Sequence, residues 1–179
     1  MKKIVFVSLL FCVVVHNISA KELVHEHVEQ KTTNEIVNGN INFNFQELSD
    51  TEKENLLSKA KEVRENAYVP YSKFKVGAAV LTEDGKIFTG CNVENASFGL
   101  TICAERCAIF KAVSEGYTKF KAIAVTLDDN EPGRPCGACR QVIREFGKDI
   151  IIIMSNLNDD IDIEPISNLL PKAFALDQK

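Results

Sequence analysis

Histidine is scarce in this sequence and is confined to its N-terminal end. The chain has three histidines, His16, His25 and His27, so none follows residue 27. A domain folded from the later residues cannot use histidine as a general base or a metal ligand. His27-Val28-Glu29 fits an H-x-E pattern, but it lies in a polar stretch without helical periodicity, and we attribute the match to chance. With histidine excluded, cysteine is the soft metal ligand that remains for such a domain.

Runs of basic residues are also absent, and the formal net charge is −4. Proteins that bind nucleic acid usually carry a basic face or stripe, so this balance gives no support to a nucleic-acid partner. Internal repeats and low-complexity tracts are missing as well. Hydrophobic residues make up 45% of the chain, which is enough for the core of one folded domain.

No apolar run is long enough for a comfortable transmembrane helix. The run over residues 4–15 follows two lysines and precedes the small residues Ser19 and Ala20. A basic start, a short apolar stretch and small residues after it are typical of a secretory signal peptide. We expect residues 1–20 to be such a signal, cleaved after Ala20, and the protein to be secreted without a membrane partner. A cytosolic location is the alternative if the signal is not used.

The cysteine count does not fit a simple disulfide framework. Cys12 lies in the expected signal, so five of the six cysteines remain in the mature chain. An odd number argues against complete pairing in an exported protein. Three metal-bound thiolates would account for it and would leave Cys91 and Cys107, either free or paired with each other.

A single domain is expected over residues 48–179, after a polar segment over 21–47 that is rich in asparagine and glutamate. Ser49 and Glu52 form a capping box before a helical apolar pattern. Helices then alternate with buried strands, which predicts an α/β fold with helices on both faces of a mixed sheet. The expected elements are a helix over 50–66, strands over 74–80 and 87–92, a helix from an N-cap at Thr101 to Gly116, a strand over 120–127, a helix over 135–146, a strand over 149–154 and a short strand over 161–163.

Two cysteine motifs lie at the starts of expected helices. Cys103-Ala104-Glu105 follows Thr101, and Cys136-Gly137-Ala138-Cys139 follows Pro135, which we place just inside the helix. Successive parallel β-α-β-α units put their helix N-termini at the same edge of a sheet. The two motifs can therefore converge, and helix N-termini favour the thiolate form of cysteine.

Three thiolates, from Cys103, Cys136 and Cys139, can hold a zinc ion and leave its fourth position to water. Zinc lowers the pKa of such a water, and Glu105 can take its proton and pass it to a substrate. A closed structural site would need a fourth ligand, for which Cys91 and Cys107 are candidates. A lone C-x-x-C would also fit a redox pair or half of a zinc ribbon, but the joint pattern favours the open, catalytic site.

Polar residues just before the first cysteine motif are candidates for substrate binding. Asn92 and Glu94 follow an expected strand, where they are either ligand-binding side chains or ordinary loop residues. On pattern alone, Phe74 and Phe98 are core residues.

Several segments together resemble one enzyme family. The stretches YVPYSKFKVGAAV (68–80), GCNVENASFGLTICAERCAIFKAVSEG (90–116), PCGACRQVIREFG (135–147) and LLPKAF (169–174) are similar to the small homotetrameric cytidine deaminases. The resemblance covers residues 48–175. It implies a three-layer α/β/α sandwich with a five-stranded mixed sheet, and hydrolysis of cytidine or deoxycytidine to uridine or deoxyuridine and ammonia.

The same resemblance implies a role for individual residues. One zinc ion per subunit is held by the three cysteines, and Glu105 is the proton shuttle. The pyrimidine nucleoside is the small-molecule partner, and each subunit helps to complete its neighbours' sites in a homotetramer. Asn92 and Glu94 are implied to hold the ribose, and Phe74 and the backbone of Ala104 to contact the base. Arg106 is implied as a counter-charge to the thiolates. Phe98 and Phe174 are implied to cover a neighbouring subunit's site.

Two features depart from the usual family pattern. Arg134 stands before the P-C pair, where a serine is usual, and the signal peptide is uncommon in a mostly cytosolic family. Asn95-Ala96-Ser97 is an N-glycosylation sequon, which we expect to stay unmodified in active protein.

Other functions compete with this hypothesis. One is deamination of a nucleoside-like antibiotic, which Asn92 and Glu94 disfavour because they suit a ribose. Another is polynucleotide editing, which the acidic net charge disfavours. The third is a catalytically silent secreted binding protein, which the intact Glu105 disfavours.

Overall fold

The computed structural model describes residues 48–176. The expected signal peptide over 1–20 and the polar segment over 21–47 lie outside the described residues. Within them, no helix combines the length and the apolar character that crossing a membrane requires. The elements in chain order are α2 (Asp50–Arg64), β1 (Val76–Thr82), β2 (Ile87–Cys91), the 3-10 helix η1 (Phe98–Leu100), α3 (Ala104–Ser114), β3 (Phe120–Leu127), α4 (Gly137–Phe146), β4 (Ile151–Asn156), β5 (Ile161–Pro165) and α5 (Ile166–Leu169).

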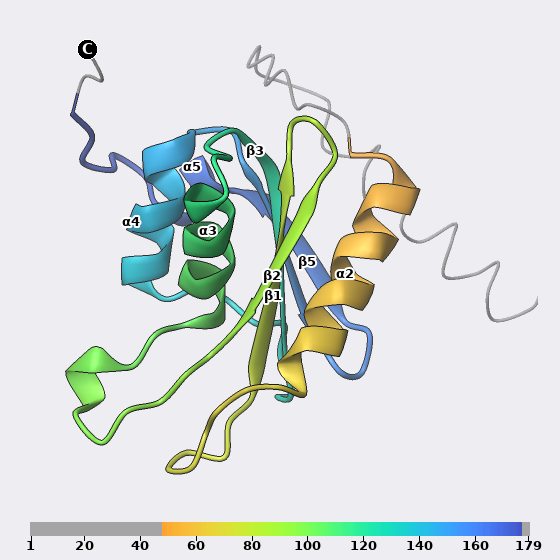
Figure 1. Ribbon diagram of the computed structural model, residues 1–179. Helices are drawn as coiled ribbons and strands as arrows, with labels where there is room; N and C mark the ends of the chain where they lie inside the picture. The colour runs from red at the N-terminus through yellow and green to blue at the C-terminus, as the bar shows by residue number, and fades with distance from the viewer. Residues whose placement is uncertain (1–47, 177–179) are drawn as a thin grey trace, which may run out of the picture. The chain divides into compact units, whose positions relative to one another are not determined.

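The five strands form one mixed sheet in the order β2-β1-β3-β4-β5. The pair β3 and β4 is parallel, and the other neighbouring pairs are antiparallel. Helix α2 covers one face of the sheet, and α3, α4 and α5 cover the other (Figure 1). The expected α/β/α arrangement with a five-stranded mixed sheet is confirmed.

The central strands are buried on both faces, which explains their nearly continuous apolar sequence. Alternate residues point to opposite faces of a strand, so Ala78 and Val80 pack in the core beneath α3 and α4, whereas Ala79 and Leu81 pack beneath α2. Helix α2 begins at the expected capping box, in which Ser49 and Glu52 satisfy each other's backbone N–H groups. The core thus fixes the sheet on which the site is built.

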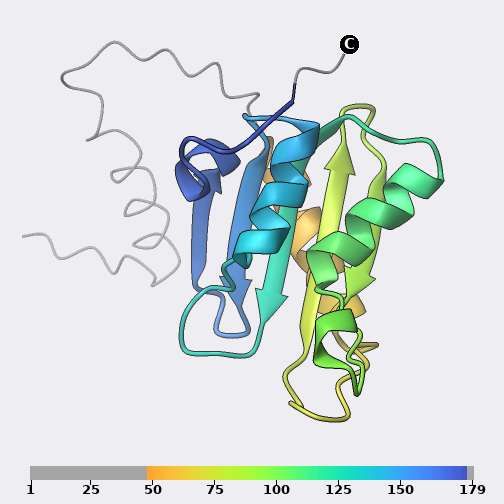
Figure 2. The same cartoon turned by 90° about the vertical axis from the view of Figure 1, so that its left-hand side faces the viewer.

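The topology brings two helix starts to the same edge of the sheet. Strands β2 and β3 both run antiparallel to β1 and therefore share one direction, and β4 runs parallel to β3. Helix α3 follows β2, and α4 follows β3. Both helices consequently begin at the edge where those strands end (Figure 2), as the motif spacing predicts.

Two details of the helix starts differ from the sequence-based expectation. The N-cap of α3 is Cys103 and not Thr101, because Ile102 is held in extended backbone by two hydrogen bonds with Val93. Pro135 lies before the N-cap of α4 and not inside the helix, because Cys136 is itself extended, with φ −65° and ψ 165°. Cys103 and Cys136 therefore occupy equivalent N-cap positions.

Candidate metal centre

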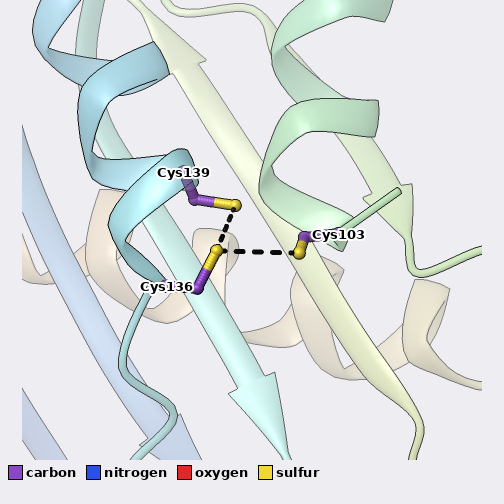
Figure 3. Close-up of side chains that lie close together, drawn as sticks. All are labelled: Cys103, Cys136 and Cys139. Atoms are coloured by element: carbon purple, nitrogen blue, oxygen red, sulfur yellow. Dashed lines mark hydrogen bonds between the residues drawn. The ribbon is translucent and has the colours of Figure 1, made fainter. Parts of the chain in front are cut away.

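Three cysteine sulfurs meet where α3 and α4 begin. Cys103 Sγ lies 3.9 Å from Cys136 Sγ, which lies 3.5 Å from Cys139 Sγ, and all three atoms are within 4.8 Å of one another. The side chains of Cys103 and Cys136 point toward each other across the gap between the helices, and Cys139 joins them from the first turn of α4 (Figure 3). The structure therefore brings together the three residues that the motifs predict to bind a metal.

Backbone contacts place the first of these cysteines. The two hydrogen bonds between Val93 and Ile102 join the segment after β2 to the residue before Cys103. Helix α3 also lies directly against β2 at Gly90, where an added Cβ would come within 2.4 Å of the Ala108 nitrogen. A glycine at this point of β2 lets the start of α3 approach the sheet closely.

The sulfurs are too close to one another to ionise independently. Hydrogen bonding from Cys139, with help from Arg106, lowers the pKa of Cys103 to about 5. The bond to Cys103, and then burial, raises the pKa of Cys139. The shared hydrogen bond thus favours the thiolate form of Cys103 and the protonated form of Cys139.

A soft dication fits this donor set. Zinc binds cysteine in its thiolate form, and the positive charge of such an ion would favour the thiolate form of all three cysteines. Cys91 and Cys107 are half-buried thiols, and burial raises the pKa of each. Neither belongs to the sulfur cluster found among residues 48–176, so three cysteines converge there, and a zinc ion held by them would have its fourth position available to water.

Glu105 is a buried carboxyl in the first turn of α3, with 4% of its surface exposed. Burial raises the pKa of Glu105 above its ordinary value, and the nearby negative Cys103 adds to this effect. A carboxyl with a raised pKa is suited to accepting and returning a proton near neutral pH. The sequence-based choice of Glu105 thus agrees with its surroundings.

Arg106 is a cation in direct contact with the sulfur cluster. Its Nη2 donates to Cys103 Sγ at 3.5 Å and to the carbonyl oxygen of Thr101 at 3.3 Å. The pKa of Arg106 is raised, first by its hydrogen bond to Cys103. The guanidinium therefore offsets part of the thiolate charge.

A second group of expected site residues lies around the loop before β1. Asn92 Nδ2 donates to the carbonyl oxygen of Phe74 at 2.8 Å, and Asn92 Oδ1 accepts from Val76 N at 2.9 Å. Glu94 Oε2 accepts from Tyr71 N at 2.9 Å and from Ser72 N at 3.2 Å. Asn92, Glu94 and Phe74 thus form one connected unit, joined to Cys103 through the chain between β2 and α3.

The contacts to Glu94 also determine its charge. Hydrogen bonding from Ser72, followed by the backbone N–H of Tyr71, lowers the pKa of Glu94. The carboxylate is therefore an ionised acceptor beside the loop. These backbone donors cannot be predicted from the sequence, because every residue except proline carries the same N–H group.

Two expected site residues lie outside these groups. Phe98 belongs to η1, is 77% exposed and contacts Tyr71 edge-on, with ring centroids 6.1 Å apart. Phe174 follows α5, is 70% exposed and is tied to α4 by a hydrogen bond from Gln141 Nε2 to its carbonyl oxygen.

Two further residues singled out in the sequence lie near the helix starts. Ala104 is fully buried at the start of α3. Arg134, before the second cysteine motif, forms an ion pair with Glu131.

The chain is similar to one protein family along most of its described length. Residues 50–155 match the sequence model of the cytidine and deoxycytidylate deaminase zinc-binding region. A cytidine deaminase of Sporosarcina psychrophila is 54% identical over 68% of this chain and 90% of its own length. One from Mycobacterium tuberculosis is 43% identical over 73% and 95%.

A solved structure agrees with these matches. The crystal structure of cytidine deaminase from Burkholderia pseudomallei superposes with a TM-score of 0.66 at 51% identity, and the similarity covers 68% of this chain and 98% of that one.

Proposed function

This chain belongs to the cytidine deaminase family, and from that premise we propose that it is a zinc enzyme that hydrolyses cytidine and deoxycytidine to uridine, deoxyuridine and ammonia. The observation that carries the proposal is the convergence of three cysteine sulfurs within 4.8 Å of one another, with the buried Glu105 in the same helical turn as one of them. A metal-activated water beside a carboxyl proton carrier is the arrangement that hydrolytic deamination of a pyrimidine needs.

Cys103, Cys136 and Cys139 would hold one zinc ion per subunit. When bound, the ion supplies an acidified water as the nucleophile for the ring carbon that carries the amino group. Glu105 takes one proton from this water and delivers it to the neighbouring ring nitrogen as the water oxygen bonds to the ring carbon. It then takes the second proton of the former water and delivers it to the amino group, which leaves as ammonia when the C–N bond breaks. Arg106 limits the negative charge that three thiolates bring to the centre.

We assign the nucleoside contacts to the unit around Asn92. Glu94, an ionised acceptor, is suited to a ribose hydroxyl, and the remaining hydrogen of the Asn92 amide is available to the same group. Phe74 is 40% exposed and offers an aromatic surface to the base. The backbone of Ala104 lies beside Cys103 and is assigned to the pyrimidine edge.

We further propose a homotetramer in which subunits complete one another's sites. Exposed aromatic and aliphatic side chains gather on η1 and its neighbouring loop, where Tyr71, Phe98 and Leu100 are each more than half exposed. Apolar surface of this kind marks an interaction site. Phe98 and Phe174 are the residues we assign to the cover over a neighbouring site.

The expected signal peptide supports a proposal for the setting of the reaction. Residues 1–20 direct the chain to secretion, and the mature enzyme acts in extracellular pyrimidine salvage. N-terminal sequencing of protein recovered from the medium of producing cells tests this, with Lys21 as the expected first residue. Intact Met1 on active intracellular protein contradicts it.

Purified protein with measured zinc content tests the function. The absorbance of cytidine should fall as uridine and ammonia appear in equal amounts, chelation should abolish the activity, and added zinc should restore it. A folded, zinc-loaded protein that leaves cytidine and deoxycytidine unchanged would contradict the proposal and favour the silent binding protein. Activity on a nucleoside-like antibiotic alone would favour the other enzyme hypothesis.

A further inference from the structure

The residue directly after the last cysteine of the cluster bridges two parts of the chain. Arg140 Nε donates to the carbonyl oxygen of Pro135 at 2.8 Å, and its Nη1 donates to the carbonyl oxygen of Leu169 at 2.8 Å. The Arg140 backbone N–H also donates to the carbonyl oxygen of Cys136 at 2.9 Å. One half-buried residue thus holds both the cysteine at the N-cap of α4 and the residue before it.

This contact matters because Cys136 is the least supported ligand of the cluster. Cys139 is buried within α4, and Cys103 is held by the hydrogen bonds between Val93 and Ile102 and by Arg106. Cys136 is exposed, sits at the end of the long connection from β3, and makes no side-chain capping bond. Its sulfur position therefore depends on the backbone at Pro135 and Cys136.

The other end of the bridge is anchored in the core. Leu169 is the last residue of α5, and a helix end leaves carbonyl groups without partners inside the helix. Ile166 at the start of α5 is fully buried, and its N–H donates to the carbonyl oxygen of Ile150 beside β4. The Arg140 guanidinium consequently ties the backbone of Pro135 to an element fixed against the sheet.

We propose that Arg140 is a positioning residue that holds Cys136 in metal-binding geometry before the metal arrives. It acts through the Pro135 peptide and the end of α5, and it bonds to carbonyl groups and not to sulfur. Arginine suits this role, because its planar fork presents several donors in fixed directions, whereas lysine presents one compact ammonium group. The inference rests on the proposed zinc site, and it adds a supporting residue to that site.

The test uses the full folded protein and zinc itself as the probe. Arg140→Met keeps side-chain length without hydrogen-bond donors, Arg140→Lys keeps the charge, and Arg144→Met on the same helix is the matched control. Zinc affinity is measured by competition with a chelator, and cobalt substitution reports ligand geometry through its absorption bands. Loss of a supporting contact outside the ligands lowers metal affinity by about 10- to 100-fold.

We expect a loss in that range for Arg140→Met, with altered cobalt bands, partial recovery in Arg140→Lys and wild-type behaviour in Arg144→Met. Wild-type affinity and wild-type cobalt bands in a folded Arg140→Met protein would overturn the inference. If Arg140→Met does not fold, the zinc affinity of Arg140→Lys is the test, since one ammonium group cannot reproduce both hydrogen bonds. An Arg140→Lys protein with wild-type zinc affinity would also overturn the inference. A wild-type protein that binds zinc but does not deaminate cytidine would contradict the proposed function and leave this inference standing.

Discussion

Asn92 holds Phe74 in place through a hydrogen bond from its amide Nδ2 to the Phe74 carbonyl oxygen at 2.8 Å. Its Oδ1 accepts from Val76 N, so one amide fixes the loop on both sides of Lys75. The residue that we assign to the ribose therefore also fixes the backbone of Phe74, whose ring we assign to the base.

Replacing this amide by a carboxylate should damage both roles. In Asn92→Asp, an oxygen replaces the Nδ2 donor and faces the Phe74 carbonyl. We expect the free energy of unfolding to fall by about 1–3 kcal/mol, because an acceptor is left without a donor, and KM for cytidine to rise by about tenfold. Urea denaturation and steady-state kinetics measure the two effects.

Asn95→Asp is the matched control for this substitution. Asn95 lies in the same exposed connection, and its Oδ1 accepts from Ser97 N, which an aspartate can also do. An Asn92→Asp enzyme with the KM and stability of Asn95→Asp would contradict the double role.

Gly90 should tolerate no side chain. An added Cβ would lie 2.4 Å from Ala108 N and 2.7 Å from the carbonyl oxygen of Ala104, and both atoms belong to the backbone of α3. Because α3 carries Cys103 at its start, we expect Gly90→Ala to lower the free energy of unfolding by about 1–3 kcal/mol or more and to weaken zinc binding. Gly99→Ala, whose Cβ meets nothing within 4 Å, is the control, and equal stability of the two variants would refute the close-packing argument.

The Glu52–Lys121 ion pair gives stability a defined dependence on pH. Lys121, and then Ser49, lower the pKa of Glu52 from its ordinary value of 4.5 to about 2. The pair therefore stabilises the fold fully above about pH 4.5, and this contribution is lost as the pH falls toward 2.

Glu52→Gln isolates this charge, because glutamine can still accept the capping hydrogen bond from Ser49 N. We expect it to be less stable than wild type by about 0.5–1 kcal/mol at pH 7, as for a partly exposed pair, and the difference to shrink as the pH falls below 4.5. Glu54→Gln on the same helix is the control. A difference that does not change between pH 7 and the acid limit of folding would show that the charge is not its cause.

Phe98 should act between subunits and not within one. It is 77% exposed in η1, so its truncation removes little packing inside a single chain. We expect Phe98→Ser to shift the proposed tetramer toward smaller species in sedimentation equilibrium and to raise KM for cytidine. Ile161→Ser replaces a half-exposed residue of β5 at the far edge of the sheet and should leave the proposed tetramer intact. A tetramer unaffected by Phe98→Ser would argue against the proposed interface.

Much of the fold could be predicted from local patterns. The β3 strand was expected at its observed bounds, because it is apolar throughout and ends at the polar run after Leu127. The start of α2 was found from Ser49 and Glu52, since a capping box is a local interaction. The N-cap of α3 lies two residues after the predicted Thr101, because the extended backbone at Ile102 depends on Val93, and pairing between distant segments leaves no local signal.

The candidate site, like the fold, could be predicted only where the sequence carries a local pattern. The spacing of the cysteines and of Glu105 predicted the cluster, because the topology brings helix starts together at one sheet edge. The bridge from Arg140 to Leu169 and the donors from Tyr71 and Ser72 to Glu94 could not be predicted. These contacts involve backbone atoms, which every residue carries, so they cannot be predicted from the residue types.

Glu105→Gln in zinc-loaded protein tests the central claim most directly, with Glu115→Gln at the other end of α3 as the control. Glutamine keeps the size of the side chain but cannot carry the proton. We expect kcat for cytidine to fall by about 100- to 10,000-fold with zinc content unchanged, and the control to match wild type. A Glu105→Gln enzyme that binds zinc and keeps most of the wild-type kcat would contradict the account.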